Sequence, residues 1–137
     1  MSVSHGGART GARVLIVDDD PLWRRSLHAM LSRDHDVRVA DSGPEALDWL
    51  EQTDFDVVIS DLSMPGMDGR DLHAIVHRRW PWLAARFLFV SGGWPEELAS
   101  FVHQLGDRML RKTNDATALA ADLRQRLELV SLGRATS

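Results

Sequence analysis

The chain has 137 residues, of which 44% are hydrophobic, and its formal net charge of −4 corresponds to a sequence pI of about 5.8. This length supports one buried core but not two domains, and the acidic balance argues against a surface that binds nucleic acid. The chain contains no cysteine, which excludes disulfides and thiolate metal sites and favours a reducing, cytoplasmic location.

The two ends of the chain are expected to lie outside the folded domain. Residues 1–12 are small and polar and lack the apolar run of a secretory signal, so they predict a flexible tail. The domain is expected to span 13–132, followed by a short C-terminal tail at 133–137. No segment reaches the ~20 apolar residues of a membrane span, so no membrane partner is expected.

Short apolar runs predict the strands of a parallel sheet. Three of them are too short for helices and rich in β-branched or aromatic residues, which indicates buried strands at 14–17, 57–59 and 87–90. Weaker strands are expected at 37–39, where the alternation is typical of an edge strand, and at 108–111.

Segments of helical period lie between these strands. Asp20 before Pro21 suits a helix start, and Ser42 with Glu45 forms a capping box. Leu22, Leu27 and Leu31 share one apolar face. The predicted helices are 21–33, 43–51, 69–80, 95–105 and 115–131. This alternation predicts an α/β domain with helices on both faces of the sheet and a ligand site beyond the carboxyl ends of the strands.

Polar residues follow four of the strands and should converge at that edge. Asp18 and Asp19 follow the first strand, Asp61 the third, Ser91 the fourth and Lys112 the fifth. Neighbouring carboxylates repel one another, and a hard cation such as Mg²⁺ would neutralise them. With the metal bound, Asp61 could act as a nucleophile towards phosphorus. Lys112 and Ser91 could then contact the phosphoryl oxygens.

Four motifs in this order resemble the receiver domains of two-component response regulators. They are Val-Asp-Asp-Asp at 17–20, Asp-Leu-Ser-Met-Pro-Gly-Met-Asp-Gly at 61–69, Val-Ser-Gly at 90–92 and Leu-Arg-Lys at 110–112. The resemblance covers roughly residues 13–131. It implies a flavodoxin-like (βα)5 fold with strand order 2-1-3-4-5, and a sensor histidine kinase or histidine phosphotransfer protein as phosphoryl donor.

The same resemblance assigns roles to individual residues. It implies that Asp61 is the phosphoacceptor, with Asp18 and Asp19 as the acidic pair that binds Mg²⁺. The Ser63 main-chain carbonyl would be a further metal ligand. Ser91 and Lys112 would bind the phosphoryl group and take part in the switch. The expected protein is a single-domain regulator, not a turnover enzyme, that signals through protein–protein contacts as a monomer or weak dimer.

Two positions depart from the family pattern. Met109 stands where an aromatic switch residue is common, and Thr113 replaces a proline. A receiver-fold binding module that signals without phosphorylation is therefore one alternative. A receiver excised from a hybrid histidine kinase is a second. A phosphatase of the haloacid dehalogenase class, with Asp18 as nucleophile, is disfavoured because a lone Asp61 follows the third strand.

Several other polar or aromatic residues have ordinary structural interpretations. Asp20 and Asp68 are expected to be helix caps. His73 and His77 are one helical turn apart, but no third ligand accompanies them, so a solvated helix face is expected. Trp94, in the loop after Ser91, is expected to be exposed and to contact a partner. The basic cluster around Trp80-Pro81-Trp82 is expected only to surround a helix end; it consists of Arg78, Arg79 and Arg86.

Overall fold

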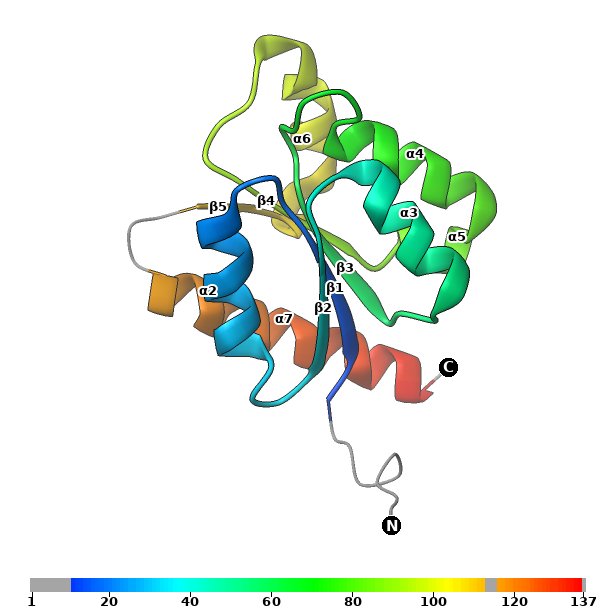
Figure 1. The fold of residues 1–137 in the computed structure, drawn as a ribbon, viewed down its shortest axis with the longest axis vertical. Helices are drawn as coiled ribbons and strands as arrows, with labels where there is room; N and C mark the ends of the chain where they lie inside the picture. Colours follow the sequence, from blue (N-terminus) through cyan, green and yellow to red (C-terminus); the bar gives the residue numbers. More distant parts are fainter. Residues whose placement is uncertain (1–10, 113–115, 137) are drawn as a thin grey trace.

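The computed structural model describes residues 11–112 and 116–136, and its five strands form one parallel sheet (Figure 1). The strand order is β2-β1-β3-β4-β5, which confirms the predicted flavodoxin-like, doubly wound topology. The strands are β1 (Arg13–Val17), β2 (Asp36–Ala40), β3 (Val57–Asp61), β4 (Phe87–Ser91) and β5 (Met109–Arg111). The alternating segment expected as an edge strand is indeed β2, at one edge of the sheet.

The sheet separates two apolar cores because successive side chains of a strand point to opposite faces. In β1, Leu15 and Val17 enter the larger core, whereas Val14 and Ile16 enter the smaller one. The larger core is closed by α3 (Gly43–Gln52), α4 (Gly69–Arg79), α5 (Pro81–Ala84) and α6 (Ala99–Leu105). The smaller core is closed by α2 (Pro21–Leu31) and α7 (Ala116–Thr136), which lie side by side in Figure 1.

Side-chain caps start the helices next to the carboxyl ends of the strands. The Asp20 carboxylate accepts from the Leu22 amide at 2.9 Å, and Asp68 and Asp71 form a reciprocal capping box at the start of α4. Both aspartates are therefore caps, as expected. The predicted box at Ser42 is only half present, because Glu45 accepts from the Asp41 amide instead of the Ser42 amide.

Several boundaries differ from the predictions. The helix expected at 69–80 ends at Arg79, and Pro81 begins the separate α5, because proline suits the first turn of a new helix. The helix expected at 95–105 starts with a 3₁₀ turn, η1 (Glu96–Leu98), and a second turn, η2 (Gly106–Arg108), precedes β5. The last helix continues to Thr136, so 133–136 of the expected C-terminal tail are helical.

The first described residues belong to the fold. Ala12, expected in the N-terminal tail, is buried, and its amide donates to His35 Nδ1 at 2.9 Å. Leu22, expected on the apolar face of α2, is 64% exposed, whereas Leu27 and Leu31 are buried. Among the described helices, none has the length and apolar character needed to cross a membrane.

Candidate functional site

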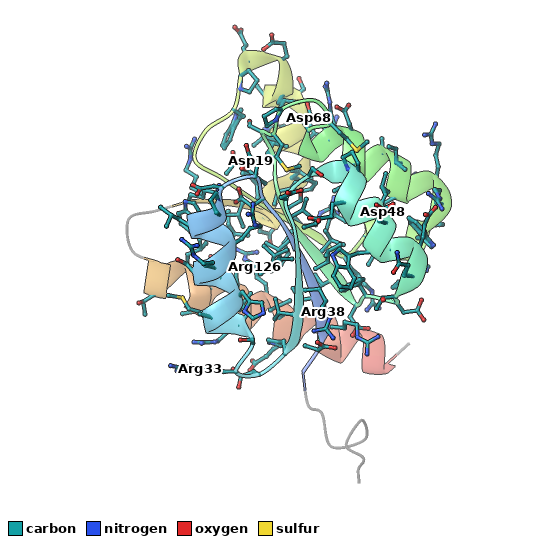
Figure 2. The ribbon with its side chains drawn as sticks, viewed as in Figure 1. Asp19, Arg33, Arg38, Asp48, Asp68 and Arg126 are labelled. Atoms are coloured by element: carbon teal, nitrogen blue, oxygen red, sulfur yellow. The ribbon has the colours of Figure 1, made fainter. Side chains whose placement is uncertain are left out.

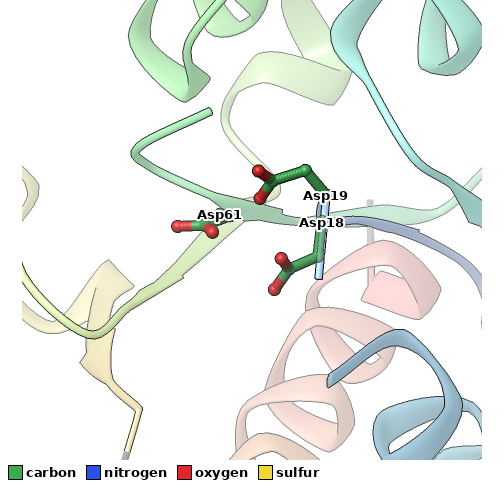
Figure 3. Close-up of side chains that lie close together, drawn as sticks. All are labelled: Asp18, Asp19 and Asp61. Atoms are coloured by element: carbon green, nitrogen blue, oxygen red, sulfur yellow. The ribbon is translucent and has the colours of Figure 1, made fainter. Parts of the chain in front are cut away.

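Three carboxylates meet at the carboxyl ends of β1 and β3. Asp18 directly follows β1 and Asp61 ends β3, and these strands are parallel neighbours in the sheet. Asp18 and Asp61 are 2% and 7% exposed, whereas Asp19 is exposed. One oxygen of each carboxylate lies within 4.8 Å of the others, and Figure 3 shows the three side chains gathered at these strand ends. The structure thus brings together the three acids that the sequence singled out.

Lys112 completes this acidic cluster from the end of β5. Its Nζ lies 2.8 Å from Asp18 Oδ2 and 3.1 Å from Asp61 Oδ2. Its main-chain amide donates to the Ser91 carbonyl at 3.0 Å, which continues the β4–β5 pairing by one residue and directs the lysine towards the site. The lysine side chain is 12% exposed, so its charge is compensated by the two carboxylates more than by water.

Burial and charge shift the ionisation of this cluster. Burial raises the pKa of Asp18 from 3.8 to about 6, against the lowering effect of its hydrogen bonds from Lys112 and the Asp20 amide. The negative charge of Asp61 raises the same pKa further. Burial lowers the pKa of Lys112, but its bonds and attraction to Asp18 and Asp61 outweigh burial, and the net pKa is raised. At neutral pH the lysine is therefore charged.

Local backbone contacts hold Asp61 in place. Its Oδ1 accepts from the Ser63 amide at 3.2 Å, and its carbonyl accepts from the Ser60 hydroxyl at 2.8 Å. Gly69 allows the start of α4 to approach, since a Cβ there would lie 2.5 Å from the Asp61 carbonyl oxygen. The glycine is thus needed for close packing against the strand end. Its role was not predicted, although its place directly after the cap Asp68 was a usable signal.

The hydroxyl of Ser91 is engaged within its own loop. Ser91 ends β4, is 1% exposed, and donates to the Gly93 carbonyl at 2.7 Å. The Ser63 hydroxyl donates to the same carbonyl at 3.3 Å. Gly93 therefore links the loop after β3 with the loop after β4, beside Asp61.

The donor set suits a hard divalent cation. All three acidic side chains offer oxygen, the ligand atom that Mg²⁺ prefers. Burial, and to a smaller extent the charge of Asp61, raise the pKa of Asp18 and so disfavour its charged form, which a bound cation would stabilise. The residues present therefore fit Mg²⁺. Figure 2 shows Asp19 and Asp68 in the upper half of the view, at the same end of the domain, and Arg33 and Arg38 in the lower half.

Met109, the predicted switch position, and Trp94, the predicted contact position, are both half-buried against the larger core. The guanidinium carbon of Arg111 lies 4.4 Å from the centroid of the Trp94 ring. The expectation that Trp94 is exposed is wrong, because this arginine and the core cover part of the ring, and its contact with a partner stays a prediction. Thr113 lies outside the described residues.

The histidine pair is only partly solvated. His77 is exposed, as expected, but His73 is half-buried and its Nε2 lies 3.0 Å from the Ala84 carbonyl. The ring of His73 also contacts Phe87, Phe89 and Phe101. Burial lowers the pKa of His73. The predicted solvated face is therefore wrong for His73, which joins α4 to α5, β4 and α6.

Arg79, in the basic cluster at the end of α4, makes structural contacts. Arg79 pairs with Glu51 of α3 at 2.7 Å, and its guanidinium lies 4.4 Å from the Trp80 ring. Trp82 is 50% exposed. Trp82 is therefore more exposed than Trp94 and is the better placed of the two to contact a partner.

Two residues of α2 contribute to the site and were not predicted. Arg24 Nη1 donates to the Asp18 carbonyl at 2.7 Å, which holds the end of β1 against the helix. Lys112 Nζ lies 5.3 Å from the centroid of the Trp23 ring. Both side chains come from the first turn after the Asp20 cap. The sequence offered no signal for these contacts, since they depend on how α2 crosses the sheet.

Comparison with known proteins agrees with this geometry. The family model of the response regulator receiver domain matches residues 14–127. The chain belongs to the response regulator receiver domain family. Receiver domains are phosphoacceptors that interact with histidine kinases or phosphotransfer proteins, and they bind Mg²⁺ at an acidic pocket.

Individual relatives of this receiver domain support the assignment. The response regulator protein FleR of Pseudomonas aeruginosa is 38% identical over 82 residues, which is 59% of this chain and 17% of FleR. The sensor kinase CckA of Brucella abortus is 39% identical over 84 residues, which is 59% of this chain and 9% of CckA. The chain thus matches less than a fifth of either relative.

A solved structure gives the same fold. The CheY-like receiver domain protein of Methanospirillum hungatei superposes with a TM-score of 0.75 at 25% identity, covering 90% of this chain and 99% of that protein. The agreement spans nearly the whole of that protein, so the strand ends that carry Asp18, Asp61, Ser91 and Lys112 belong to a common receiver framework.

Proposed function

We propose that this receiver domain accepts a phosphoryl group on Asp61 in a Mg²⁺-dependent reaction. One observation carries the proposal: Asp61 lies 3.1 Å from Lys112 and also within 4.8 Å of the Asp18 and Asp19 oxygens. Among the described residues, no other group of three carboxylates could hold a metal in this way. Asp18 has the same neighbours, with Lys112 at 2.8 Å, so the choice of Asp61 as the acceptor rests on its place at the end of β3, where the receiver-like motif at 61–69 begins.

In the proposed reaction an oxygen of Asp61 attacks the phosphorus of a phosphohistidine. The P–N bond breaks, its electron pair stays with the imidazole nitrogen, and an acyl phosphate forms on Asp61. Mg²⁺, held by Asp18, Asp19, Asp61 and the Ser63 main-chain carbonyl, would neutralise charge on the phosphoryl oxygens. Lys112, already beside Asp61, balances the remaining charge, and the Ser91 hydroxyl donates to a phosphoryl oxygen once it leaves Gly93.

The proposed donor is a sensor histidine kinase or a histidine phosphotransfer protein, and the output is a protein–protein contact. We propose a single-domain regulator of the cytoplasm, monomeric or weakly dimeric, that binds neither nucleic acid nor membrane. Its likeness to a sensor kinase favours a second arrangement, in which the domain is the receiver of a hybrid kinase. The chemistry at Asp61 is the same in both.

Phosphotransfer profiling tests this proposal. Labelled sensor kinases and phosphotransfer proteins from the source organism are each mixed with the wild-type chain, with Asp61→Asn and with Asp48→Asn, an exposed acidic control on α3. The proposal predicts rapid, Mg²⁺-dependent labelling of the wild type and of the control by at least one donor. Equal labelling of Asp61→Asn, or no labelling of the wild type by any donor, would contradict it.

A further inference from the structure

The loop between β4 and η1 is held beside the site through the backbone of Gly93, whose amide donates to the Ser91 hydroxyl oxygen at 3.4 Å. The Gly93 carbonyl accepts from the Ser91 hydroxyl at 2.7 Å and from the Ser63 hydroxyl at 3.3 Å. A Cβ at Gly92 or Gly93 would meet nothing within 4 Å, so the two glycines themselves add little packing. These hydroxyl contacts and the next residue, Trp94, therefore decide where the loop lies.

Trp94 is held by Arg111, which is the neighbour of Ser91 in the sheet. Ser91 and Arg111 are register partners of the β4–β5 pair, and the Arg111 guanidinium lies 4.4 Å from the Trp94 ring centroid. Arg111 is exposed, whereas Trp94 packs partly against the larger core. Two consecutive residues of the loop are thus tied to this strand pair: Gly93 bonds to Ser91, and Trp94 contacts Arg111, the residue paired with Ser91 on the adjacent strand.

The hydroxyl of Ser91 has one proton to donate. In the observed arrangement that proton is used by Gly93, so Ser91 contacts a phosphoryl oxygen on Asp61 only after it has left Gly93. The Ser63 hydroxyl, at the longer distance of 3.3 Å, then remains as the hydroxyl donor to the carbonyl. Any contact that fixes Trp94 in place favours the arrangement in which Gly93 and Ser91 are bonded.

We propose that Arg111 is a positioning residue of the phosphorylation switch: through the Trp94 ring it holds the loop so that Ser91 stays bonded to Gly93. This inference rests on the proposed function of Asp61. A phosphoryl group at Asp61 needs the arrangement in which Ser91 has left Gly93. A contact that stabilises only the arrangement in which Ser91 is bonded to Gly93 therefore lowers the affinity for that group. Arg111 therefore weakens binding of a phosphoryl group, or of its mimic, at Asp61.

An ordinary electrostatic role for Arg111 predicts the opposite change in affinity for the phosphoryl mimic. Arg111 directly precedes Lys112, and a cation beside the site attracts an anionic phosphoryl mimic. On that view, removal of the charge weakens binding of the mimic. If Arg111 acts mainly through Trp94, its removal tightens binding, and the direction of the change separates the two roles.

The test is a titration of the full chain with beryllium at fixed excess fluoride and Mg²⁺, followed by two-dimensional NMR of the backbone amides. For Arg111→Gln we expect binding about two- to five-fold tighter than in the wild type, the size that follows from a solvent-exposed cation–π contact. Trp94→Leu, which removes the ring instead, should show the same tightening. Arg111→Lys keeps a cation for the ring and should stay near the wild type.

Arg70→Gln is the matched charge control. Arg70 is exposed and follows Gly69, which lies against the Asp61 carbonyl, so this variant removes a nearby charge without the ring contact. It should bind the mimic slightly more weakly or equally. Unchanged or weaker binding in both Arg111→Gln and Trp94→Leu would overturn the inference. Failure of the wild type to bind the mimic at all would instead contradict the proposed function.

A second readout reports on the ring itself. The indole N–H signal of Trp94, assigned by its loss in Trp94→Leu, should move in Arg111→Gln before any mimic is added. The Trp49 indole, which donates to the Val39 carbonyl at 3.0 Å, is the internal reference and should not move. A Trp94 signal unchanged by the Arg111 substitution would also overturn the inference, whatever the binding data.

Discussion

Lys112 Nζ lies 2.8 Å from Asp18 Oδ2, closer than its 3.1 Å distance from the proposed acceptor Asp61. The lysine is thus shared between a proposed metal-binding acid and the proposed phosphoacceptor. Both carboxylates are nearly inaccessible to water, so neither has another strong source of charge compensation at hand. The lysine is therefore a structural cation for both carboxylates, besides its proposed role in binding the phosphoryl group.

Lys112→Met should lower the free energy of unfolding at neutral pH by about 3 kcal/mol, the order expected when one partner of a buried ion pair is removed. The double variant Asp18→Asn/Lys112→Met should regain much of this loss, because it no longer leaves a buried carboxylate without its cation. Urea unfolding in the presence of a chelator measures both. Equal stabilities of the single and double variants would show that Lys112 does not compensate Asp18.

The raised pKa of Asp18 predicts that this residue's contribution to the free energy of unfolding is greatest at acidic pH. Burial raises that pKa from 3.8 to about 6, so between these values the folded chain holds a proton that the unfolded chain releases. The stabilising contribution is fully present below the unfolded pKa and is lost as pH rises through about 6. In chelator, wild-type stability relative to Asp18→Asn should therefore fall over this range. Parallel profiles of the two proteins would contradict the prediction.

Mg²⁺ should raise the melting temperature of the wild type by mass action, because it binds the folded site and relieves repulsion among the three acids. At one hundred times its Kd the ion would add about 2.7 kcal/mol of stability. Asp19→Asn should weaken the effect without leaving a buried group unpaired, since Asp19 is exposed. Asp48→Asn is the matched surface control. No Mg²⁺-dependent shift of the wild type at tens of millimolar would refute the metal site.

Phosphorylation should reorganise mainly residues 91–97 and only weakly the fifth strand and its flanking helices. The loop is fixed through the Gly93 carbonyl, which loses its Ser91 partner, while Met109 offers no rigid ring to turn inward. Amide hydrogen exchange with and without beryllium fluoride measures this. Protection changes at 107–131 that equal or exceed those at 91–97 would contradict it.

Local sequence signals accounted for most of the fold. The short runs of β1, β3 and β4, rich in β-branched or aromatic residues, predicted strands correctly, and the caps at Asp20 and Asp68 marked helix starts correctly. Boundaries that depend on backbone context were less accurate. The sequence predicted that Pro81 lies near a helix end, but not that it begins the separate helix α5. This helix has only four residues, which is too short for hydrophobic periodicity to reveal it.

The convergence of the acids was predictable because parallel strands bring their carboxyl ends to one edge, and the strand order implied by the receiver resemblance placed Asp18 and Asp61 on neighbouring strands. The surroundings of side chains were not predictable in the same way. His73 is covered by aromatic rings from β4 and α6, and Trp94 is covered by Arg111 of β5. Such contacts depend on the crossing of elements far apart in the sequence, which no local pattern encodes.

The most direct test of the account is the intact mass of the chain after incubation with acetyl phosphate and Mg²⁺. The wild type and the surface control Asp48→Asn should each gain the mass of one phosphoryl group, and the gain should disappear when Mg²⁺ is chelated beforehand. Asp61→Asn, shown by circular dichroism to be folded, should gain none. Retention of the full phosphoryl mass by Asp61→Asn would contradict the central claim that Asp61 is the acceptor.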